Sequence, residues 1–332
     1  MNFIPENVAP LNTRRIGIYD KNGNRVGFIP LGSLTPPNPA QKLYSFGALS
    51  DVHITYTTAQ ADFQKALTYL NETEDVEFTC ICGDLTENGS AEQLTIYKSY
   101  VDTYSADTPV YAISGNHEGT DGVSVTSERI QPYTGQPFYY SFTHGNDVFI
   151  MLGEYRWDNS YLFEDGELQW LYEKLEANRN KRCFVFFHVF PWGDCGNANG
   201  AYQNDLFSGM QGNVFKSLMA HYKNVTLFHG HSHFRFELQE EDLKANYSHA
   251  FGYRSVHIPS LAVPRDIVDG SRVDIYAESE GYVVDVYENG IHLRGRDFVK
   301  GEFLPIASYW LDTTLQTIPA KSYTDSTGTI KV

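Results

Sequence analysis

The sequence is poor in cysteine, with four in 332 residues. Cys80, Cys82 and Cys183 lie inside apolar, strand-like runs, where a small buried thiol is the ordinary interpretation. Cys80 and Cys82 have the spacing of a metal-binding pair, but no second cysteine pair completes a tetrahedral set. We therefore expect thiols that pack in the core, and neither a disulfide framework nor a structural zinc site.

Long apolar runs are absent as well. No stretch approaches the eighteen consecutive apolar residues that would predict a transmembrane helix. The N-terminus, from Met1 to Asn7, lacks the charged-then-apolar pattern of a secretory signal. These absences predict a cytoplasmic protein without a membrane partner. Its 42% hydrophobic content, with 14% aromatic residues, is ample for a buried core.

Positive charge is scarce: 25 Lys and Arg stand against 41 Asp and Glu, for a net charge of −16. Non-specific binding to a polyanion draws its free energy from Lys and Arg that displace counterions from phosphates. We therefore expect no nucleic-acid partner. A small phosphate ester is not excluded, because bound dications would invert the local potential.

The first 40 residues are predicted to form an N-terminal extension. After an irregular, proline-containing start, Arg15–Tyr19 and Arg25–Ile29 flank Asn22-Gly23, and Asn-Gly between two such segments is the strongest short hairpin signal. Three prolines between Leu34 and Pro39 then indicate a linker. We place the domain boundary after residue 40.

Residues 41–305 are predicted to form the main, α/β domain, in which short apolar runs alternate with helical patterns around a largely parallel sheet. The predicted strands are Tyr44–Leu49, Phe78–Cys82, Val110–Ile113, Val148–Leu152, Cys183–Phe187 and Val225–Phe228. The predicted helices are Ala59–Leu70, Ala91–Tyr104 and Gln169–Ala177. Beyond Gly252, a hairpin of Tyr282–Tyr287 and Ile291–Arg296 predicts a second, antiparallel layer. Residues 306–332 are expected to be a C-terminal tail.

Five short polar clusters stand where apolar runs end. They are Asp51-Val52-His53, Gly83-Asp84, Gly115-Asn116-His117-Glu118, Phe187-His188 and Gly230-His231-Ser232-His233. In an open α/β sheet, the carboxyl ends of the strands gather side chains that are distant in sequence. These clusters supply two carboxylates, one amide oxygen and four or five imidazoles, which are donors that divalent Mn, Fe or Zn prefer. The pattern predicts a two-metal hydrolytic site.

The order DxH, GD, GNH(E/D), H, GHxH resembles the calcineurin-like metallophosphoesterases, from about Leu43 to Phe303. The resemblance implies a four-layer αββα sandwich with two facing sheets. It also implies a centre of two divalent or mixed-valence metal ions, Mn, Fe or Zn, that share Asp84. One ion would be held by Asp51, His53, Asp84 and His233, and the other by Asp84, Asn116, His188 and His231. His117, beside the Asn ligand, would be a catalytic residue that faces the substrate.

Hydrolysis of a phosphate ester is the activity that the resemblance implies. A hydroxide bridging the two ions would attack phosphorus in line with the departing alkoxide. His117 would stabilise or protonate the leaving oxygen. Purple acid phosphatases share the Gly115–Glu118 motif, but they have a metal-bound tyrosine at the position of Glu87 and no histidine at that of His53. The segment from Gly83 to Gly89 is more similar to bacterial cyclic-nucleotide and glycerophosphodiester phosphodiesterases.

The expected substrate is therefore a small phosphodiester. Two alternatives stay open: a phosphomonoesterase at the same site, or a binding or assembly protein whose phosphoesterase activity is minor. A nuclease is disfavoured by the acidic composition. A protein phosphatase is disfavoured because no obvious arginine accompanies the Gly83–Gly89 or Gly115–Glu118 motifs. Neither the metal identity nor the oligomeric state follows from the sequence.

Simpler interpretations exist for single residues. Capping would explain Asp84 or Asn116 alone, and a lone histidine after an apolar run, such as His188, is often a core residue. Structural or surface roles are expected for His144, His221, His229, His249, His257 and His292. His257 is the exception to watch, because Arg254 or Arg265 near it could reach a phosphate oxygen. Packing between layers is expected for Tyr133, Phe138, Tyr139, Tyr140 and Phe142, with a pocket rim that includes Tyr155, Trp157 and Trp192 as the alternative.

Overall fold

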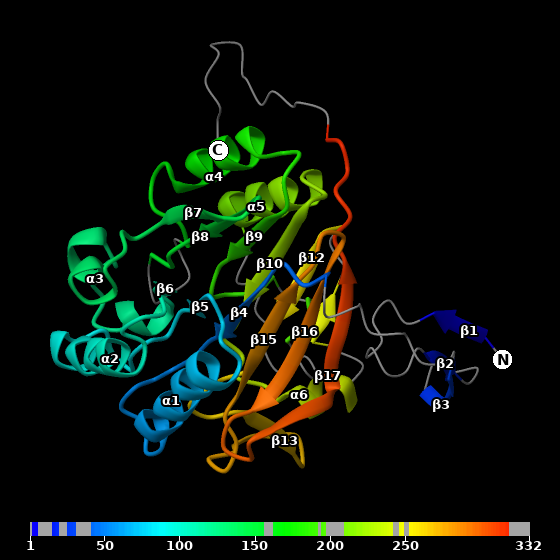
Figure 1. Ribbon diagram of the computed structural model, residues 1–332, viewed down its shortest axis with the longest axis horizontal. Coiled ribbons are helices and arrows are strands. Elements are labelled where there is room, and N and C mark those ends of the chain that lie inside the picture. Colours follow the sequence, from blue (N-terminus) through cyan, green and yellow to red (C-terminus); the bar gives the residue numbers. More distant parts are fainter. Residues whose placement is uncertain are drawn as a thin grey trace.

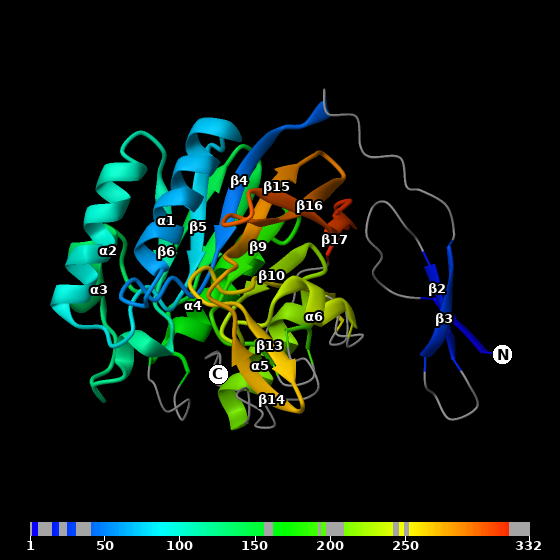
Figure 2. The same cartoon turned by 90° about the horizontal axis from the view of Figure 1, so that it is seen from below.

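The computed structural model describes residues 2–5, 15–19, 25–30, 41–155, 162–191, 194–196, 209–241, 246–248 and 252–318. Two six-stranded mixed sheets form the centre of the molecule, and helices cover their outer faces (Figures 1 and 2). None of the helices in these residues is long and apolar enough to cross a bilayer.

The first sheet has the strand order β17-β16-β15-β4-β5-β6. Its parallel part consists of β4 (Tyr44–Leu49), β5 (Phe78–Cys82) and β6 (Val110–Ile113). Its antiparallel part consists of β15 (Glu280–Val286), β16 (Gly290–Asp297) and β17 (Glu302–Asp312). The strands β4, β5 and β6 have the bounds predicted from the sequence.

The second sheet has the order β11-β12-β10-β9-β8-β7. Its four parallel strands are β8 (Asp147–Met151), β9 (Cys183–Phe186), β10 (Val225–His229) and β12 (Arg254–His257). Its antiparallel edges are β7 (Tyr140–His144) and β11 (Tyr247–Ser248). The prediction of one largely parallel sheet is thus wrong, because the parallel strands are divided between two sheets.

Helices complete the four layers of the αββα sandwich, as predicted. The outer face of the first sheet is covered by α1 (Ala59–Thr68), a π-helical turn η2 (Tyr69–Thr73), α2 (Ala91–Tyr104) and α3 (Ser127–Thr134). The outer face of the second is covered by α4 (Glu167–Ala177) and α5 (Gly209–His221). Figure 1 shows α4 and α5 on one side of the strands and α1 and α2 on the other.

An aromatic core joins the two sheets. Alternate residues of β4 point into it, as expected for a strand whose successive side chains face opposite sides. Phe46 lies 5.4 Å from Phe78 of its own sheet, with the rings stacked. It meets Phe149 and Phe184 of the second sheet edge to face, at 5.3 and 5.6 Å between ring centroids. The core of large rings holds the two sheets together at a fixed separation.

The C-terminal hairpin extends the first sheet. β15 pairs antiparallel with β4, with Tyr282 opposite Ala48, so β15 to β17 cover the edge that β4 would otherwise leave open. The separate antiparallel layer predicted beyond Gly252 is therefore wrong. β17 ends at Asp312 and so crosses residue 305, after which we expected the tail to begin.

The N-terminal extension contains one strand more than predicted. β2 (Arg15–Tyr19) and β3 (Arg25–Pro30) form the predicted hairpin, while its Asn22-Gly23 turn lies outside the described residues. β1 (Asn2–Pro5) pairs with the open edge of β2, where we expected an irregular start. These three strands pair with no other described strand and lie to one side of the sandwich (Figure 2).

Candidate metal centre

The seven predicted metal ligands all lie at the carboxyl ends of parallel strands. They follow β4, β5 and β6 of the first sheet and β9 and β10 of the second: Asp51, His53, Asp84, Asn116, His188, His231 and His233. Because the two sheets face each other, these strand ends meet. His231 is partly exposed, and the other six side chains are buried.

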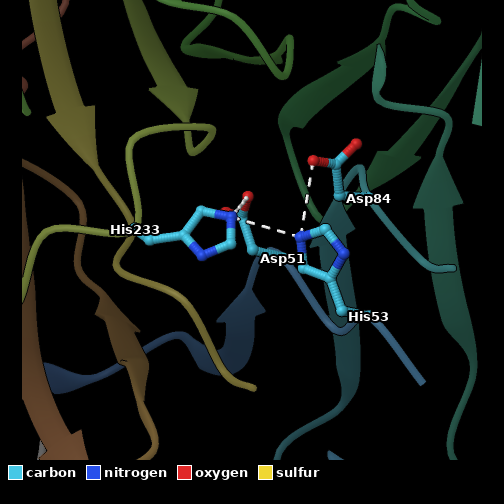
Figure 3. Close-up of side chains that lie close together, drawn as sticks. All are labelled: Asp51, His53, Asp84 and His233. Atoms are coloured by element: carbon cyan, nitrogen blue, oxygen red, sulfur yellow. Dashed lines mark hydrogen bonds and ion pairs between the residues drawn. The ribbon is translucent and has the colours of Figure 1, made fainter. Parts of the chain in front are cut away.

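Four of these side chains converge on one buried point, which we call the first cluster (Figure 3). Oδ1 of Asp51 lies 3.0 Å from Nε2 of His233. The same nitrogen of His233 lies 3.1 Å from Nε2 of His53, which in turn is 3.6 Å from Oδ2 of Asp84. Each residue offers a ligand atom within 4.8 Å of the others. The first cluster is the set that we predicted for one metal.

A second cluster consists of Asp84, His188 and His231, again with ligand atoms within 4.8 Å of one another. Nε2 of His188 lies 3.0 Å from Oδ2 of Asp84. Nδ1 of His231 lies 2.9 Å from Oδ1 of Asn116, which adds the amide to this cluster. Asp84 belongs to both clusters, so the other six residues surround one shared carboxylate.

The hydrogen bonds of two histidines through Nδ1 direct their Nε2 atoms into this centre. Nδ1 of His188 lies 2.7 Å from the carbonyl of Cys82, and Nδ1 of His233 lies 3.3 Å from the carbonyl of Val263. A carbonyl oxygen only accepts, so Nδ1 donates and a neutral ring has a lone pair at Nε2. Both Nε2 atoms face carboxylate oxygens at 3.0 Å. Lone pairs that face one another in a buried space need a cation between them, so the clusters fit a dinuclear metal site.

Electrostatics in the metal-free centre show the same need for positive charge. Burial acts to raise the pKa of Asp84, but His188 outweighs it and holds this pKa well below the ordinary value. Burial also opposes ionisation of Asp51, while His233 and His188 hold its pKa low. Burial, together with the charge of His188, lowers the pKa of His231 to about 3. Ionised carboxylates and a neutral imidazole are the forms that bind metal ions.

The backbone is strained at these residues. Seven described residues other than glycine have φ in the left-handed region, and five of them are predicted ligands: Asp51, His53, Asp84, His231 and His233. Each such conformation costs on the order of 1–3 kcal/mol and persists only where surrounding contacts hold it. The strain is therefore concentrated at the loops that carry the donors.

The motif glycines make room for the ligands. Gly83 has φ +84°, and a Cβ there would lie 2.7 Å from the ring of His188, so this residue serves both the turn and the close approach. Gly115 has φ −110°, which any residue adopts. A Cβ at Gly115 would lie 2.5 Å from the backbone nitrogen of Asp84. A left-handed turn is thus present at Gly83, whereas at Gly115 the glycine is required for space.

His117 stands beside the centre and, like His231, is partly exposed, with 18% of its side chain accessible. Its backbone nitrogen donates to Oδ1 of Asp84 at 2.9 Å. Its Nδ1 lies 2.8 Å from the carbonyl of Glu87, and its Nε2 lies 4.0 Å from Oδ2 of Asp84. The ring is thus oriented by a backbone acceptor, with Nε2 near the shared carboxylate.

Sequence reasoning missed two residues that support His53. Oε2 of Glu87 lies 2.9 Å from Nδ1 of His53, which fixes the ring through its outer nitrogen. The ring of Tyr56 stacks on that of His53 at 4.7 Å, with 7° between the planes. The sequence signal for Glu87 is its place three residues after Asp84. Tyr56 belongs to no motif.

The remaining histidines of the described chain lie outside the two clusters. Arg254 bonds to Thr226 and Lys223 at the amino end of β10, far along the sheet from the centre, so it cannot serve a phosphate there. Arg265, in contrast, lies next to the first cluster, because it donates its backbone N–H to the carbonyl of His233. His249, Trp157 and Trp192 lie outside the described residues.

The aromatic residues between Tyr133 and Phe142 pack in the core, as predicted. Phe138 and Tyr140 are buried, and Tyr133, Tyr139 and Phe142 pack partly buried against the same clusters. All four cysteines are free and buried, which confirms the expectation of core thiols.

A family model described as calcineurin-like phosphoesterase matches residues 44–235, more than half of the chain. Among solved structures, purple acid phosphatase PPD1 from yellow lupin (Lupinus luteus) is similar, with TM-score 0.52 and 16% identity over 93% of this chain and 63% of that chain. Our chain therefore spans less than two thirds of that protein. GAP50, described as the anchor in the inner membrane complex of Plasmodium, has TM-score 0.52 and 13% identity over 83% of this chain and 90% of that chain. At these identities the likeness concerns the fold. No curated protein matches the sequence.

Proposed function

The chain belongs to the calcineurin-like phosphoesterase family, and from this premise we propose that it hydrolyses a small phosphodiester with two divalent metal ions. One observation carries the proposal: imidazole nitrogens of three histidines face ionised carboxylates around the shared Asp84. That arrangement is unfavourable for a buried site without cations and favourable for one that holds them.

The ligand roles follow from the two clusters. Asp51, His53 and His233 would hold one ion and Asn116, His188 and His231 the other, with Asp84 between them. Mixed oxygen and nitrogen donors suit Mn, Fe or Zn. When bound, two such ions lower the pKa of water and offset the negative charge of the phosphate. The amide of Asn116 adds an oxygen donor without adding charge.

His117 is the residue that we propose for proton transfer. The Glu87 carbonyl accepts from Nδ1, so Nε2 is the atom that would hold a proton for the leaving oxygen. The partial exposure of the ring allows a substrate to reach it. Glu87 therefore serves two histidines, His53 through its carboxylate and His117 through its backbone.

The diester preference rests on the segment Gly83 to Gly89 and on His53 in the first cluster. Purple acid phosphatases lack that histidine and have a metal-bound tyrosine at the position of Glu87. In this chain Glu87 instead accepts from the outer nitrogen of His53, which supports a different use of the position. A phosphomonoesterase at the same centre is the alternative.

Comparative turnover tests the proposal. Hydrolysis of bis(p-nitrophenyl) phosphate and of p-nitrophenyl phosphate would be measured with Mn²⁺, using Asp84→Asn as the control. We expect diester turnover to exceed monoester turnover and to be lost in the variant. Monoester preference would support the alternative. No turnover of either ester by protein with two bound Mn²⁺ would contradict a hydrolytic role.

A binding role for the N-terminal extension is a second candidate. It is favoured by one observation: β1, β2 and β3 pair with no other described strand. Removal of residues 1–40 tests it. Unchanged solubility and diester turnover, together with loss of a partner, would support the binding role, whereas reduced turnover would indicate that the extension serves the phosphoesterase domain.

A further inference from the structure

One segment contacts both the loop after β4 and the turn after β10. It runs from His257, the last residue of β12, to Val263, and we call it the supporting segment. Every residue of it is buried. None belongs to the ligand motifs, and among the described residues none lies in either ligand cluster.

On one side, the supporting segment holds the backbone around Asp51. Leu261 donates its N–H to the carbonyl of Ser50 at 2.9 Å. The carbonyl of Asp51 accepts twice, from the Ser260 hydroxyl at 3.0 Å and from the N–H of Ala262 at 3.2 Å. This side of the segment therefore fixes the strained Asp51, which follows β4, by two hydrogen bonds to Asp51 and one to Ser50.

On its other side, the same segment holds the turn that carries His231 and His233. Nε2 of His257 lies 2.9 Å from the hydroxyl of Ser232, the residue between these two ligands. Nδ1 of His233 donates to the carbonyl of Val263. These contacts link a turn of the second sheet to the same segment that holds Asp51 of the first sheet.

These hydrogen bonds do more than fill the core, because they hold strained backbone conformations in place. Asp51, His231 and His233 all have left-handed φ values, which relax unless neighbouring contacts hold them. If the turn relaxed, Nε2 of His233 would leave its position 3.0 Å from Asp51. Metal ligands whose surroundings do not hold them in place bind their ion more weakly.

We propose that the supporting segment is the positioning element of the metal centre, and that His257 and Ser260 are the positioning residues that set the distance between Asp51 and His233. The inference rests on the proposed metal centre and goes beyond it. His257 acts on two ligands through Ser232, and Ser260 acts on a third through its backbone. Neither residue touches the substrate or the ions.

Mn²⁺ binding measured by calorimetry tests the inference without any need for turnover. We expect His257→Leu, Ser232→Ala and Ser260→Ala each to weaken Mn²⁺ binding by about 10–100-fold. The double variant His257→Leu/Ser232→Ala should have about the same Mn²⁺ affinity as whichever of its two single variants binds Mn²⁺ less tightly, because both changes remove the same hydrogen bond. His257→Gln, whose amide can still bond to Ser232, should restore most of the affinity.

A matched control exists in the first sheet. Nε2 of His292 lies 3.0 Å from the hydroxyl of Ser308, the same kind of bond between β16 and β17. His292→Leu should leave Mn²⁺ affinity unchanged. If His292→Leu weakened binding as much as His257→Leu, a general loss of packing would explain both, and the inference would be wrong.

Wild-type Mn²⁺ affinity in both His257→Leu and Ser260→Ala would also overturn the inference. If His257→Leu does not fold, Ser260→Ala and His257→Gln decide the question alone. Weakened Mn²⁺ affinity is expected for Ser260→Ala and near wild-type affinity for His257→Gln. The proposed hydrolytic function can fail separately. Wild-type protein that binds two Mn²⁺ but hydrolyses neither ester would contradict that function and leave the positioning role intact. Wild-type protein that binds no Mn²⁺ would contradict both.

Discussion

Buried charges are compensated in different ways at the amino and the carboxyl ends of the strands. At the amino ends, Nη2 of Arg182 pairs with Oδ2 of Asp147 at 2.5 Å, and the Tyr44 hydroxyl donates to the same oxygen at 2.7 Å. Nη1 of Arg182 donates to the carbonyl of Tyr287 at 2.7 Å and to the hydroxyl of Thr313 at 2.9 Å. At the carboxyl ends, imidazole nitrogens instead face carboxylates around Asp84.

The difference separates stability from function. The amino-end pair carries its own counter-charge and therefore needs no ligand to complete it. The carboxyl-end clusters contain no Lys or Arg, and their loops hold five residues with strained φ. Such a site is stable only if the surrounding structure supports it, and it gains stability when metal ions bind.

The largest expected effect is on turnover, from a change at the shared carboxylate. Asp84→Asn removes a charge from both clusters, so we expect diester turnover to fall to background and Mn²⁺ stoichiometry to drop. Asp62→Asn is the matched control, because Asp62 is also buried but pairs with Lys65 on α1. Full turnover in Asp84→Asn would contradict the functional role assigned to the carboxyl ends of the strands.

His117→Ala is expected to slow hydrolysis of an unactivated diester by about 10²–10⁴-fold, the usual range for a lost general acid. Mn²⁺ affinity should change little, because His117 is not a proposed ligand. The effect should be smaller on bis(p-nitrophenyl) phosphate, whose leaving group needs less protonation. An equal loss on both esters, or weakened Mn²⁺ binding, would speak against proton transfer by this residue.

Arg182→Met tests the amino end. It leaves Asp147 buried without its partner, so we expect the free energy of unfolding to fall by about 3–5 kcal/mol. Mn²⁺ affinity of the folded protein, measured by calorimetry, should stay at the wild-type value. If affinity fell together with stability, the two ends of the strands would not be independent.

Added Mn²⁺ should stabilise the fold, by about 2.7 kcal/mol at one hundred times its dissociation constant. Burial lowers the pKa of His188, but Asp84 and Asp51 outweigh it and raise this pKa well above the ordinary 6.5. The metal-free fold thus gains stability from the bound proton below pH 6.5 and loses it as pH rises through the raised pKa. Because Mn²⁺ must displace that proton, its stabilisation should grow over the same range.

The stabilisation by Mn²⁺ is measured as the difference between the melting temperature with Mn²⁺ and that with EDTA, at several pH values. A difference that shrinks as pH rises would show that protons do not compete with the metal at His188.

Local sequence signals predicted much of the sandwich. The bounds of α2 were predictable because Ser90 caps it, its side chain accepting from the N–H of Gln93. The ligand loops were predictable because their motifs follow strands. The pairing of β15 with β4 was not, since Tyr282 and Ala48 are far apart in sequence and no local pattern specifies their register.

The supporting residues of the site were also beyond the sequence. Glu87 reaches His53 only because the loops after β4 and β5 lie side by side. His257 and Ser260 act through hydrogen bonds to Ser232 and Asp51 that cross between elements. Motifs identify donor atoms, whereas the contacts that hold those donors depend on tertiary packing and can be recognised only in the structure.

The number of Mn²⁺ ions bound per chain tests the central claim most directly. Calorimetry on wild-type protein, first freed of metal with a chelator, would count them, with Asp84→Asn measured beside it. Two ions per wild-type chain and fewer in Asp84→Asn are the predicted result. One ion or none in the wild type, or two in both proteins, would contradict a dinuclear centre built around Asp84.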